Sequence, residues 1–297
     1  MSVIKGLIGL IRPINTVGAG IAVVLGSLIA GGYEIYLTTI CLISALLAAA
    51  GGMVENDIID LEVDKINAPD RSIPSGRISK KQATIFMIIL FIVSQSIIFL
   101  TNFPAIFIIS TGNILILLYS YKFKKLGFIG NIVVGITTAY CFLLGGTSIT
   151  GGLSILGIPF APIFLATPSF IRVIFPAVLA FLMNVGREIT KGIDDVEGDK
   201  KQNIKTLAVN LGKKRARYFA ITFFVATIVF SIFPFILGYF TIIYLLIAVF
   251  GIDTILVYSV YSLYKDYSPE NAHKIKKLIM FAFYLGFIAF LFGIPFS

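Results

Sequence analysis

The sequence predicts an all-α, multi-pass membrane protein with about nine transmembrane helices, and three observations lead to that fold class. The first is composition, because 58% of the 297 residues are hydrophobic, only 13% are charged and the mean hydropathy is +0.97. A soluble globule of this length could not cover its surface with so few charges. The second is a series of apolar runs long enough to cross about 30 Å of hydrocarbon. The third is a one-sided distribution of positive charge.

Nine apolar segments qualify as membrane spans. They cover residues 14–33, 35–55, 83–101, 103–121, 128–149, 171–190, 217–237, 239–262 and 276–295. Cytoplasmic loops are expected near 56–82, 121–127, 188–216 and 263–275, within a single domain over 1–297. No removable signal peptide is expected in MSVIKGLIGLIRPIN, because this stretch continues into the first span without a small-residue cleavage site.

Positive charge distinguishes the two faces of the membrane. Lys and Arg accumulate in cytoplasmic loops, and of the 24 in this chain all but Arg172 fall on one predicted side. They precede the first span and follow the second, fourth, sixth and eighth. The pattern predicts a cell-membrane protein with the N-terminus inside and the C-terminus outside. It explains the net charge of +9 without nucleic acid, and it assigns a single cation such as Lys276 to topology.

Residue usage excludes several kinds of site. Cys41 and Cys141 lie within apolar runs and His273 lies in a polar loop. A disulfide framework, a zinc site built on His and Cys, and a Ser-His-Asp triad are therefore not expected. Small residues that permit close helix contacts are expected at Gly18, Gly20, Gly51 and Gly52.

Carboxylates gather where the second span ends, in ENDIIDLEVDKINAPDRSIPSGR over residues 55–77. On a helix, Asn56, Asp60 and Asp64 follow one another at intervals of four residues, and Asp57 lies within the same arc of roughly 100°. Like charges packed on one face disfavour a helix unless a cation neutralises them. A solvated helix end would tolerate these acids but would not require their alignment.

A second cluster occurs in REITKGIDDVEGDKKQNIKT, residues 187–206. Here Glu188, Lys191, Asp195 and Asp199 fall within about 80° of one another on a helical wheel. Two helices that each end in stacked carboxylates on one side of the membrane indicate a site for one or two Mg²⁺ ions. Mg²⁺ takes oxygen ligands and usually bridges carboxylates to substrate phosphates.

Cations lie close to both clusters along the chain. Arg71 and Arg77 follow the first in a loop rich in Pro and Gly, where Arg77 could bind phosphate in bidentate fashion. The other nearby cations are Lys122, Lys124 and Lys125 in YSYKFKKLG, and Arg187, Lys191 and Lys205 around the second cluster. Each of these cations taken singly is explained by membrane topology, but acidic and basic residues that alternate in three loops favour a site for diphosphate and magnesium.

These motifs resemble the UbiA superfamily of intramembrane prenyltransferases. Its N-D-x-x-D-x-x-x-D signature is intact over residues 56–64, and its second pair of acids appears as Asp195 and Asp199 in DDVEGD. The resemblance extends to RPIN at residues 12–15 and to the YKFKK loop, and so covers nearly the whole chain. It implies a UbiA-like bundle of helices around a central cavity.

Within the superfamily, NDIIDLEVDKINAPDRSIPSGRIS, YSYKFKKLGFIGNIVVG and REITKGIDDVEGDKKQNIKTL look most like the branch that makes archaeal ether lipids. That resemblance implies Mg-dependent transfer of a geranylgeranyl group from geranylgeranyl diphosphate to the free hydroxyl of geranylgeranylglyceryl phosphate, which forms the second ether bond. The proline-rich loop is shared with chlorophyll synthases, so an aromatic or pigment acceptor of the quinone, chlorophyll or heme pathways is the alternative.

The resemblance also implies a role for each residue. Mg²⁺ would be held by Asn56, Asp60, Asp64, Asp195 and Asp199. Catalysis would depend on Asp60, Asp64, Asp195, Asp199 and Lys122. The substrates would be bound by Asn15, Asn56, Asp57, Arg71, Arg77, Lys125, Arg187 and Lys191. The partners are then an isoprenyl diphosphate, a lipid acceptor and the bilayer, while the sequence specifies neither an oligomeric state nor a general base.

Three rival classes share some of these features. An ion-coupled secondary transporter also uses paired acids, but it places them near the midplane in broken helices, whereas here only Asp253 lies deep within a span. A phospho-alcohol transferase would show Asp-Gly followed by Ala-Arg in its motif, which this chain lacks. A purely structural membrane protein would have no reason to align carboxylates twice.

Overall fold

The computed structural model describes residues 3–32, 34–150, 168–201 and 204–295, and every regular element in these ranges is helical. The chain divides into two units. Unit 1 comprises residues 1–121 and 140–170, and unit 2 comprises residues 122–139 and 171–297. Each unit contains one of the two acidic clusters.

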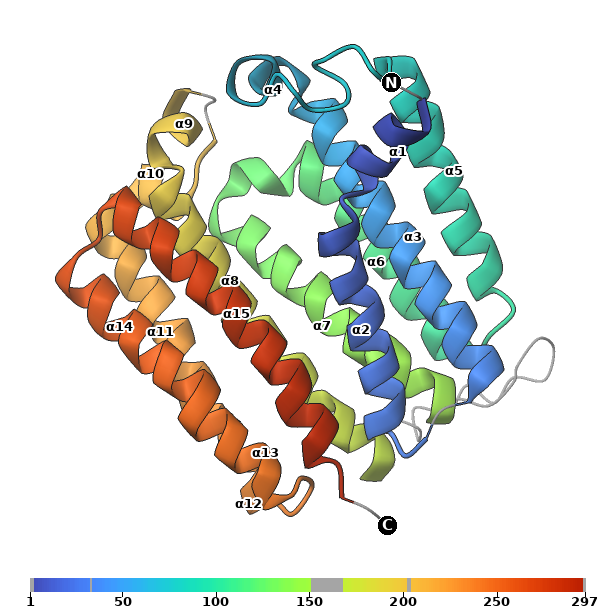
Figure 1. The fold of residues 1–297 in the computed structure, drawn as a ribbon, viewed down its shortest axis with the longest axis vertical. Helices are drawn as coiled ribbons and strands as arrows, with labels where there is room; N and C mark the ends of the chain where they lie inside the picture. The colour runs from blue at the N-terminus through green and yellow to red at the C-terminus, as the bar shows by residue number, and fades with distance from the viewer. Residues whose placement is uncertain (1–2, 33, 151–167, 202–203, 296–297) are drawn as a thin grey trace. The chain divides into compact units, whose positions relative to one another are not determined.

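Unit 1 is a helical bundle built around α3. Its helices are α1 (Val3–Ile11), α2 (Pro13–Ile29), α3 (Ile35–Ile59), α4 (Leu61–Asn67), α5 (Lys80–Ile98), α6 (Phe103–Tyr121) and the second half of α7 (Phe128–Thr150) (Figure 1). α3 packs against α2, α5 and α6. The α5 helix begins at a capping box in which Ser79 and Gln82 satisfy each other's backbone N–H groups. Buried Leu10, Val54 and Ile78 share one apolar cluster that joins α1, α3 and the start of α5.

Two glycines allow α2 and α7 to approach closely within unit 1. A Cβ on Gly26 would lie 2.1 Å from the Phe142 carbonyl oxygen, and a Cβ on Gly145 would lie 1.9 Å from the Val23 carbonyl oxygen. Only glycine fits at these two positions. Gly18, which would permit a close helix contact, has no atom of the described residues within 4 Å of its Cβ position.

Unit 2 consists of the first half of α7 and the helices that follow residue 170. Its elements are the 3₁₀ turn η1 (Phe123–Leu126), α8 (Pro168–Asp194), α9 (Val196–Lys201), α10 (Leu207–Leu211), α11 (Lys213–Ser231), α12 (Phe233–Ile236), α13 (Ile242–Ile247), the π-helical η3 (Ala248–Asp253), α14 (Thr254–Lys265) and α15 (Pro269–Gly293). α11 packs against α14, and α15 packs against both α13 and α14. Figure 1 shows α9 and α10 at the end of the unit where α8 terminates.

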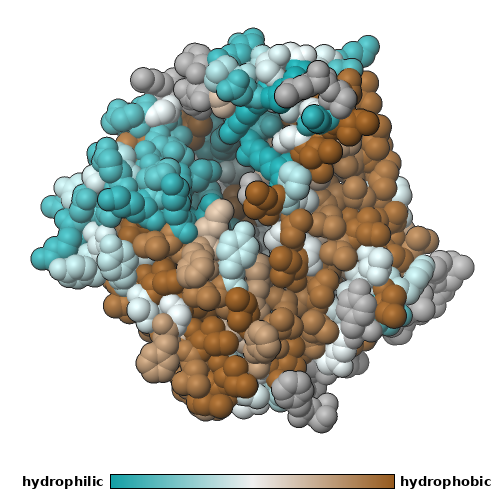
Figure 2. Space-filling view, viewed as in Figure 1, coloured by the Kyte–Doolittle hydropathy of each residue, from teal (hydrophilic) through white to brown (hydrophobic). Residues whose placement is uncertain are grey.

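The membrane spans agree with those that hydropathy predicts. Among the described residues, eight helices are long and apolar enough to cross a membrane, and the bent pair Val3–Ile11 and Thr16–Ile29 makes up to nine. Large apolar side chains of α5, including Ile85, Ile88 and Ile92, are exposed, as expected of a surface that faces lipid. Figure 2 shows hydrophobic residues over α5, and hydrophilic residues gathered over α9 and α10. The chain is an integral membrane protein.

The expected loops are shorter and more ordered than the sequence predicts. Two of them contain three short helices: α4 within 56–82, and α9 and α10 within 188–216. The last span was expected to begin at residue 276, but α15 begins at Pro269. Lys276 therefore lies within a helix, because Ser268 accepts a hydrogen bond from the Asn271 N–H and caps α15 well before the first continuous apolar run.

Candidate active site

The first acidic cluster, Asn56, Asp57, Asp60 and Asp64, lies where α3 gives way to α4. The helix is interrupted at Asp60, which separates the two elements. The backbone hydrogen bonds continue across the break, from Asp60 N–H to Asn56 O at 2.9 Å and from Asp64 N–H to Asp60 O at 2.8 Å. The four-residue spacing therefore keeps these side chains in the helical register that the sequence predicts.

Two arginines neutralise the buried carboxylates of this cluster. Asp57 and Asp64 have side chains that are only 4% and 7% exposed. Arg12 donates a hydrogen bond to Asp57, and Arg71 lies 2.5 Å from Asp64 Oδ2 and 3.6 Å from Asp57 Oδ1. The charge alignment thus has the cationic partners that it requires. Both arginines keep exposed surface, at 31% and 39%, and a guanidinium has five N–H donors.

The loop that carries Arg71 is pinned to the N-terminal helix. Ser72 donates a hydrogen bond to the Gly6 carbonyl of α1 at 2.8 Å, and Ile73 is buried in the adjoining apolar cluster. Gly76 has a φ of 75°, a conformation that favours glycine. Arg77 donates to Ser75 at 2.8 Å within the same loop. Arg71 is consequently held in place by its backbone as well as by its two carboxylate partners.

Asn56 and Glu55 contact different surroundings. The side-chain amide oxygen Oδ1 of Asn56 accepts a hydrogen bond from the Ser120 hydroxyl of α6 at 2.9 Å. Glu55 is 1% exposed, no hydrogen bond of normal geometry reaches its carboxylate oxygens among the described residues, and the Ser120 hydroxyl is the polar group that acts on it. The predicted substrate-binding residue Asn15 falls in α2, but its side chain lies outside the described residues.

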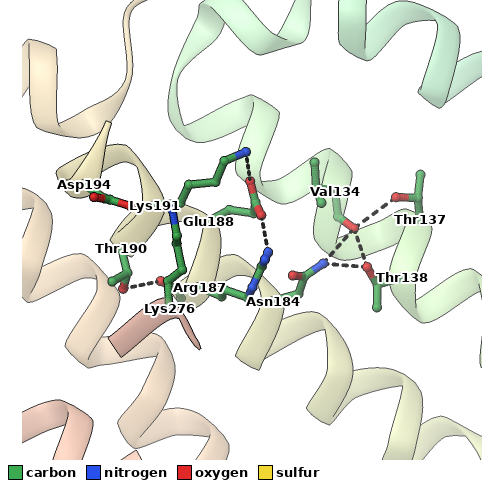
Figure 3. Close-up of polar contacts among 11 residues, drawn as sticks. Val134, Thr137, Thr138, Asn184, Arg187, Glu188, Thr190, Lys191, Asp194 and Lys276 are labelled. Atoms are coloured by element: carbon green, nitrogen blue, oxygen red, sulfur yellow. Dashed lines mark hydrogen bonds and ion pairs between the residues drawn. The ribbon is translucent and has the colours of Figure 1, made fainter. Parts of the chain in front are cut away.

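The second acidic cluster, Glu188, Lys191, Asp195 and Asp199, follows the end of α8 into α9. Asp195 separates these helices, and the hydrogen bonds Asp195 N–H to Lys191 O and Asp199 N–H to Asp195 O, both 2.9 Å, carry the helical register across. Arg187 and Lys191 contact opposite oxygens of Glu188, at 2.7 and 3.6 Å (Figure 3). Glu188 is therefore occupied as an internal counterion, and Asp195 and Asp199 are the acids of this cluster that remain for a metal.

The surroundings of Asp199 make it a weaker acid than usual. Burial and the negative charge of Asp195 together raise the pKa of Asp199 to about 6, against a hydrogen bond with Thr206 and the cations Lys191 and Lys124. Burial also raises the pKa of Asp195, opposed first by Lys191 and then by Lys276. A bound cation would favour the charged form of both carboxylates.

The predicted lysine loop lies beside this second cluster. Gly127 has a φ of 62°, and a Cβ there would come within 2.2 Å of the Lys205 carbonyl oxygen, so η1 packs against the segment that follows α9. Lys124 is the loop cation whose charge acts on Asp199. Lys122 and Lys125, which were expected to contact diphosphate, are exposed at the ends of the same turn.

The donor chemistry of the two clusters fits Mg²⁺. All candidate ligands are carboxylate or amide oxygens, the type that Mg²⁺ prefers. Within the described ranges no three Asp, Glu, His or Cys side chains form a metal cage. That arrangement is consistent with Mg²⁺, which is usually bound through one or two protein carboxylates, its own waters and substrate phosphates.

Comparison with known proteins places the fold and these motifs in a family. The sequence model for the UbiA prenyltransferase family matches residues 19–286. The chain belongs to the UbiA family. Digeranylgeranylglyceryl phosphate synthase of Methanosphaera stadtmanae is 36% identical over 288 residues, which are 96% of this chain and 98% of that protein.

Solved structures have the same fold as this chain. A structure of digeranylgeranylglyceryl phosphate synthase in membranes matches it with a TM-score of 0.79 and 31% sequence identity, over 99% of each chain. A UbiA homologue from Archaeoglobus fulgidus bound to DMAPP and Mg²⁺ has a TM-score of 0.67 and covers 96% of this chain and 99% of its own. At 18% identity, the second likeness shows the fold alone.

In this UbiA chain, two ion pairs of the acids were not anticipated from the sequence, and the expected lysine loop acts on Asp199 through a residue that had no assigned role. Arg12 was assigned to topology, yet it binds Asp57; the only signal was its place in the RPIN motif. Lys124 rather than its neighbours acts on Asp199. Lys276, also assigned to topology, forms an ion pair with Asp194, the residue before Asp195.

Proposed function

We propose that this protein transfers a geranylgeranyl group from geranylgeranyl diphosphate to the free hydroxyl of geranylgeranylglyceryl phosphate, forming the second ether bond of an archaeal membrane lipid. The observation that carries the proposal is the 36% identity to a digeranylgeranylglyceryl phosphate synthase over 96% of the chain. The two acidic clusters and the arginines beside the first are the chemistry that such a reaction needs.

The diphosphate end of the donor is assigned to the acids and to the cations beside them. Asn56, Asp60 and Asp64 of the first cluster and Asp195 and Asp199 of the second are the proposed ligands of Mg²⁺. When bound, Mg²⁺ would neutralise charge on the diphosphate and make it a better leaving group. Arg77, Lys122 and Lys125 are assigned to the charge that develops on the departing diphosphate.

The acceptor also carries a phosphate, which requires cations of its own. Arg71, Arg187 and Lys191 are the proposed binding residues, with Asp57 holding Arg71 in place. Arg71 and Arg187 each keep part of their guanidinium exposed while one edge contacts a carboxylate. A guanidinium whose position is fixed in this way loses little conformational entropy when it binds phosphate.

The reaction exchanges one carbon–oxygen bond for another. The allylic C–O bond of the donor breaks and its electron pair leaves with the diphosphate. The acceptor hydroxyl oxygen then forms the ether bond with the allylic carbon and releases its proton. Apolar helix walls exclude water, which would otherwise capture the allylic cation.

The proposed orientation places the N-terminus and both clusters in the cytoplasm and the C-terminus outside. Cysteine labelling in sealed vesicles tests it, with Cys41 and Cys141 replaced to remove background. Lys274 is exposed in the first turns of α15, and Leu237 is exposed directly after α12, so Lys274→Cys and Leu237→Cys place a thiol on each predicted side of the membrane. Labelling of Leu237→Cys from outside, and of Lys274→Cys only after permeabilisation, is expected; the reverse pattern would invert the topology.

A two-substrate assay tests the activity itself. Purified protein receives geranylgeranyl diphosphate, Mg²⁺ and either geranylgeranylglyceryl phosphate or a set of aromatic acceptors, and mass spectrometry follows the prenylated product. Product with the glyceryl phosphate alone is expected. Product with an aromatic alone would move the protein to a quinone or pigment pathway, and no product from folded protein with any acceptor would reopen the transporter hypothesis.

A further inference from the structure

Two side chains of α15 hold Asp194, the last residue of α8. Lys276 forms an ion pair with Asp194 Oδ2, and the His273 ring nitrogen Nδ1 lies 3.1 Å from the same oxygen. Lys276 and Asp194 are mostly buried, at 21% and 13% exposed. Figure 3 shows both side chains at the end of the α8 polar face that carries Glu188 and Lys191. We call Asp194, His273 and Lys276 the Asp194 clasp.

The Asp194 clasp holds the last residue of α8, directly before the break between α8 and α9. Asp195 belongs to neither α8 nor α9, and its backbone N–H bonds back to Lys191 O at 2.9 Å. Asp194 and Asp195 point about 100° apart on the helix. The clasp therefore binds the Asp194 carboxylate, while the Asp195 carboxylate remains on the helix face that carries the second acidic cluster.

The clasp is not needed to attach α15 to the bundle. Ile275 and Ile279 of α15 are fully buried, as is Ile193 of α8. α15 also packs against α13 and α14, so apolar packing already holds this helix within unit 2 without the clasp. Lys277, the next residue on α15, is exposed and would serve equally well as a topology charge. The buried ion pair at Lys276 thus calls for a more specific role.

We infer that Lys276 is a positioning residue for prenyl transfer: through Asp194 it fixes the end of α8, so that Asp195 is presented to the Mg²⁺–diphosphate. This inference rests on the proposed function. It also replaces the sequence-based expectation that Lys276 serves topology alone. Groups that orient metal ligands typically change metal affinity or activity by about 10–100-fold when they are removed.

The test compares Lys276→Ala, Lys276→Arg and the matched control Lys277→Ala. For each purified variant we would measure the Mg²⁺ concentration for half-maximal activity, KM for geranylgeranyl diphosphate, kcat at saturating Mg²⁺, and the melting temperature. Lys276→Ala is expected to raise the Mg²⁺ requirement about tenfold with a smaller effect on kcat, while Lys277→Ala matches the native protein. Lys276→Arg should recover most of the loss, because it restores the cation.

Exchanging the charges of Asp194 and Lys276 tests whether the ion pair positions Asp195 or only attaches α15 to α8. Asp194→Lys and Lys276→Asp should each weaken Mg²⁺ use, and the double variant should recover part of it, because the pair is restored with reversed polarity. If Lys276→Ala does not fold, Asp194→Asn takes its place and should show the same increase in Mg²⁺ requirement.

A binding measurement keeps this inference distinguishable from the proposed function. Mn²⁺ titration in the presence of inorganic diphosphate, followed by electron paramagnetic resonance, does not depend on the acceptor. Weaker Mn²⁺ binding by Lys276→Ala than by Lys277→Ala supports the inference even if no acceptor is prenylated. Equal Mn²⁺ binding and equal Mg²⁺ requirement in the two variants would overturn it, and a lower melting temperature alone would mark the clasp as a structural tie.

Discussion

Asp57 is a buried acid whose charge is balanced by Arg12 on one side and Arg71 on the other. Arg12 itself has a φ of 45°, in the left-handed region, at the junction between α1 and α2. A residue other than glycine adopts this conformation at a cost that its surroundings must offset. The contact with Asp57 is the interaction that offsets it here, so the N-terminal helix and the first acidic cluster are energetically linked.

Removing the Arg12 guanidinium should therefore destabilise the protein. Arg12→Ala is expected to reduce the free energy of unfolding by about 2 kcal/mol, since Asp57 keeps only the more distant Arg71 and Arg12 is partly exposed. Thermal melting in detergent measures the effect. Lys5→Ala, an exposed cation on the same segment, should leave the melting temperature unchanged. Equal melting temperatures for the two variants would show that the contact contributes no stability.

Glu55 presents the opposite situation, because this buried carboxyl has no cationic partner among the described residues and the Ser120 hydroxyl is the polar group that acts on it. Glu55→Gln should leave the melting temperature the same or raise it, because a neutral amide is less costly to bury than an unpaired charge. Asp57→Asn is the contrasting variant and should lower it, because it leaves Arg12 without its counterion. A loss of stability in Glu55→Gln as large as that in Asp57→Asn would mean that Glu55 has an ionic partner.

The pH dependence of Mg²⁺ use should follow Asp199. Its raised pKa of about 6 means that the carboxyl is charged at neutral pH and becomes protonated as the pH falls below that value. Because protons compete with the metal for this oxygen, the Mg²⁺ requirement should rise by up to about tenfold per unit between about pH 6 and pH 5. Activity measured against Mg²⁺ at several pH values tests this. Asp199→Asn should need more Mg²⁺ throughout and show a flatter profile; a native profile that stays flat across this window would remove Asp199 from the metal site.

Among the elements, α2 and α7 depend most on exact backbone fit. Gly26→Ala should lower stability by about 3 kcal/mol or prevent folding, since its Cβ would lie 2.1 Å from a backbone oxygen that cannot turn away. Gly18→Ala on the same helix is the matched control, because no atom of the residues that the structure describes lies within 4 Å of its Cβ position. Folded yield and melting temperature distinguish the two. Similar behaviour of both variants would show that α2 can move away from α7 without penalty.

The helical elements were predictable to the extent that a local pattern specifies them. Hydropathy located the spans because each long apolar run must be buried or face lipid. It placed the start of α15 seven residues late, because the polar first two turns of that helix, including Lys274 and Lys276, carry no apolar signal. The short helices α4, α9 and α10 were missed for the same reason. Their polar sequences resemble loops, although α10 begins at a cap in which Thr206 accepts a hydrogen bond from the Val209 N–H.

The sequence was enough to predict which residues belong to the candidate site, but not which of them contact one another. Four-residue spacing gave the face on which Asn56, Asp60 and Asp64 lie, because the helical period is fixed. The partners of the acids come from distant parts of the chain: Arg12 lies 45 residues before Asp57, and Lys276 lies 82 residues after Asp194. No local pattern encodes which cation meets which acid, since that depends on how the helices pack.

For the whole molecule, the two acidic clusters are proposed to act on one diphosphate. Asp60→Ala and Asp195→Ala should each abolish prenyl transfer while leaving the melting temperature within a few degrees of the native value, because each removes an oxygen ligand of Mg²⁺ and leaves the apolar packing of the helices unchanged. Product formation by mass spectrometry and thermal melting are the paired measurements. Near-native turnover in both folded variants would refute a site that uses both clusters.

Arg71 has a further consequence for how a substrate arrives. Before any phosphate binds, its guanidinium already contacts Asp64 and Asp57. An incoming phosphate must compete with these carboxylates for the Arg71 guanidinium, so phosphate replaces a carboxylate when it binds. When Asp64 is displaced, its carboxylate oxygen becomes available at the moment when a divalent ion needs one. Under the proposed function, Arg71 is thus a temporary counterion for a metal ligand, and binding of the lipid phosphate and of Mg²⁺ are mutually reinforcing steps.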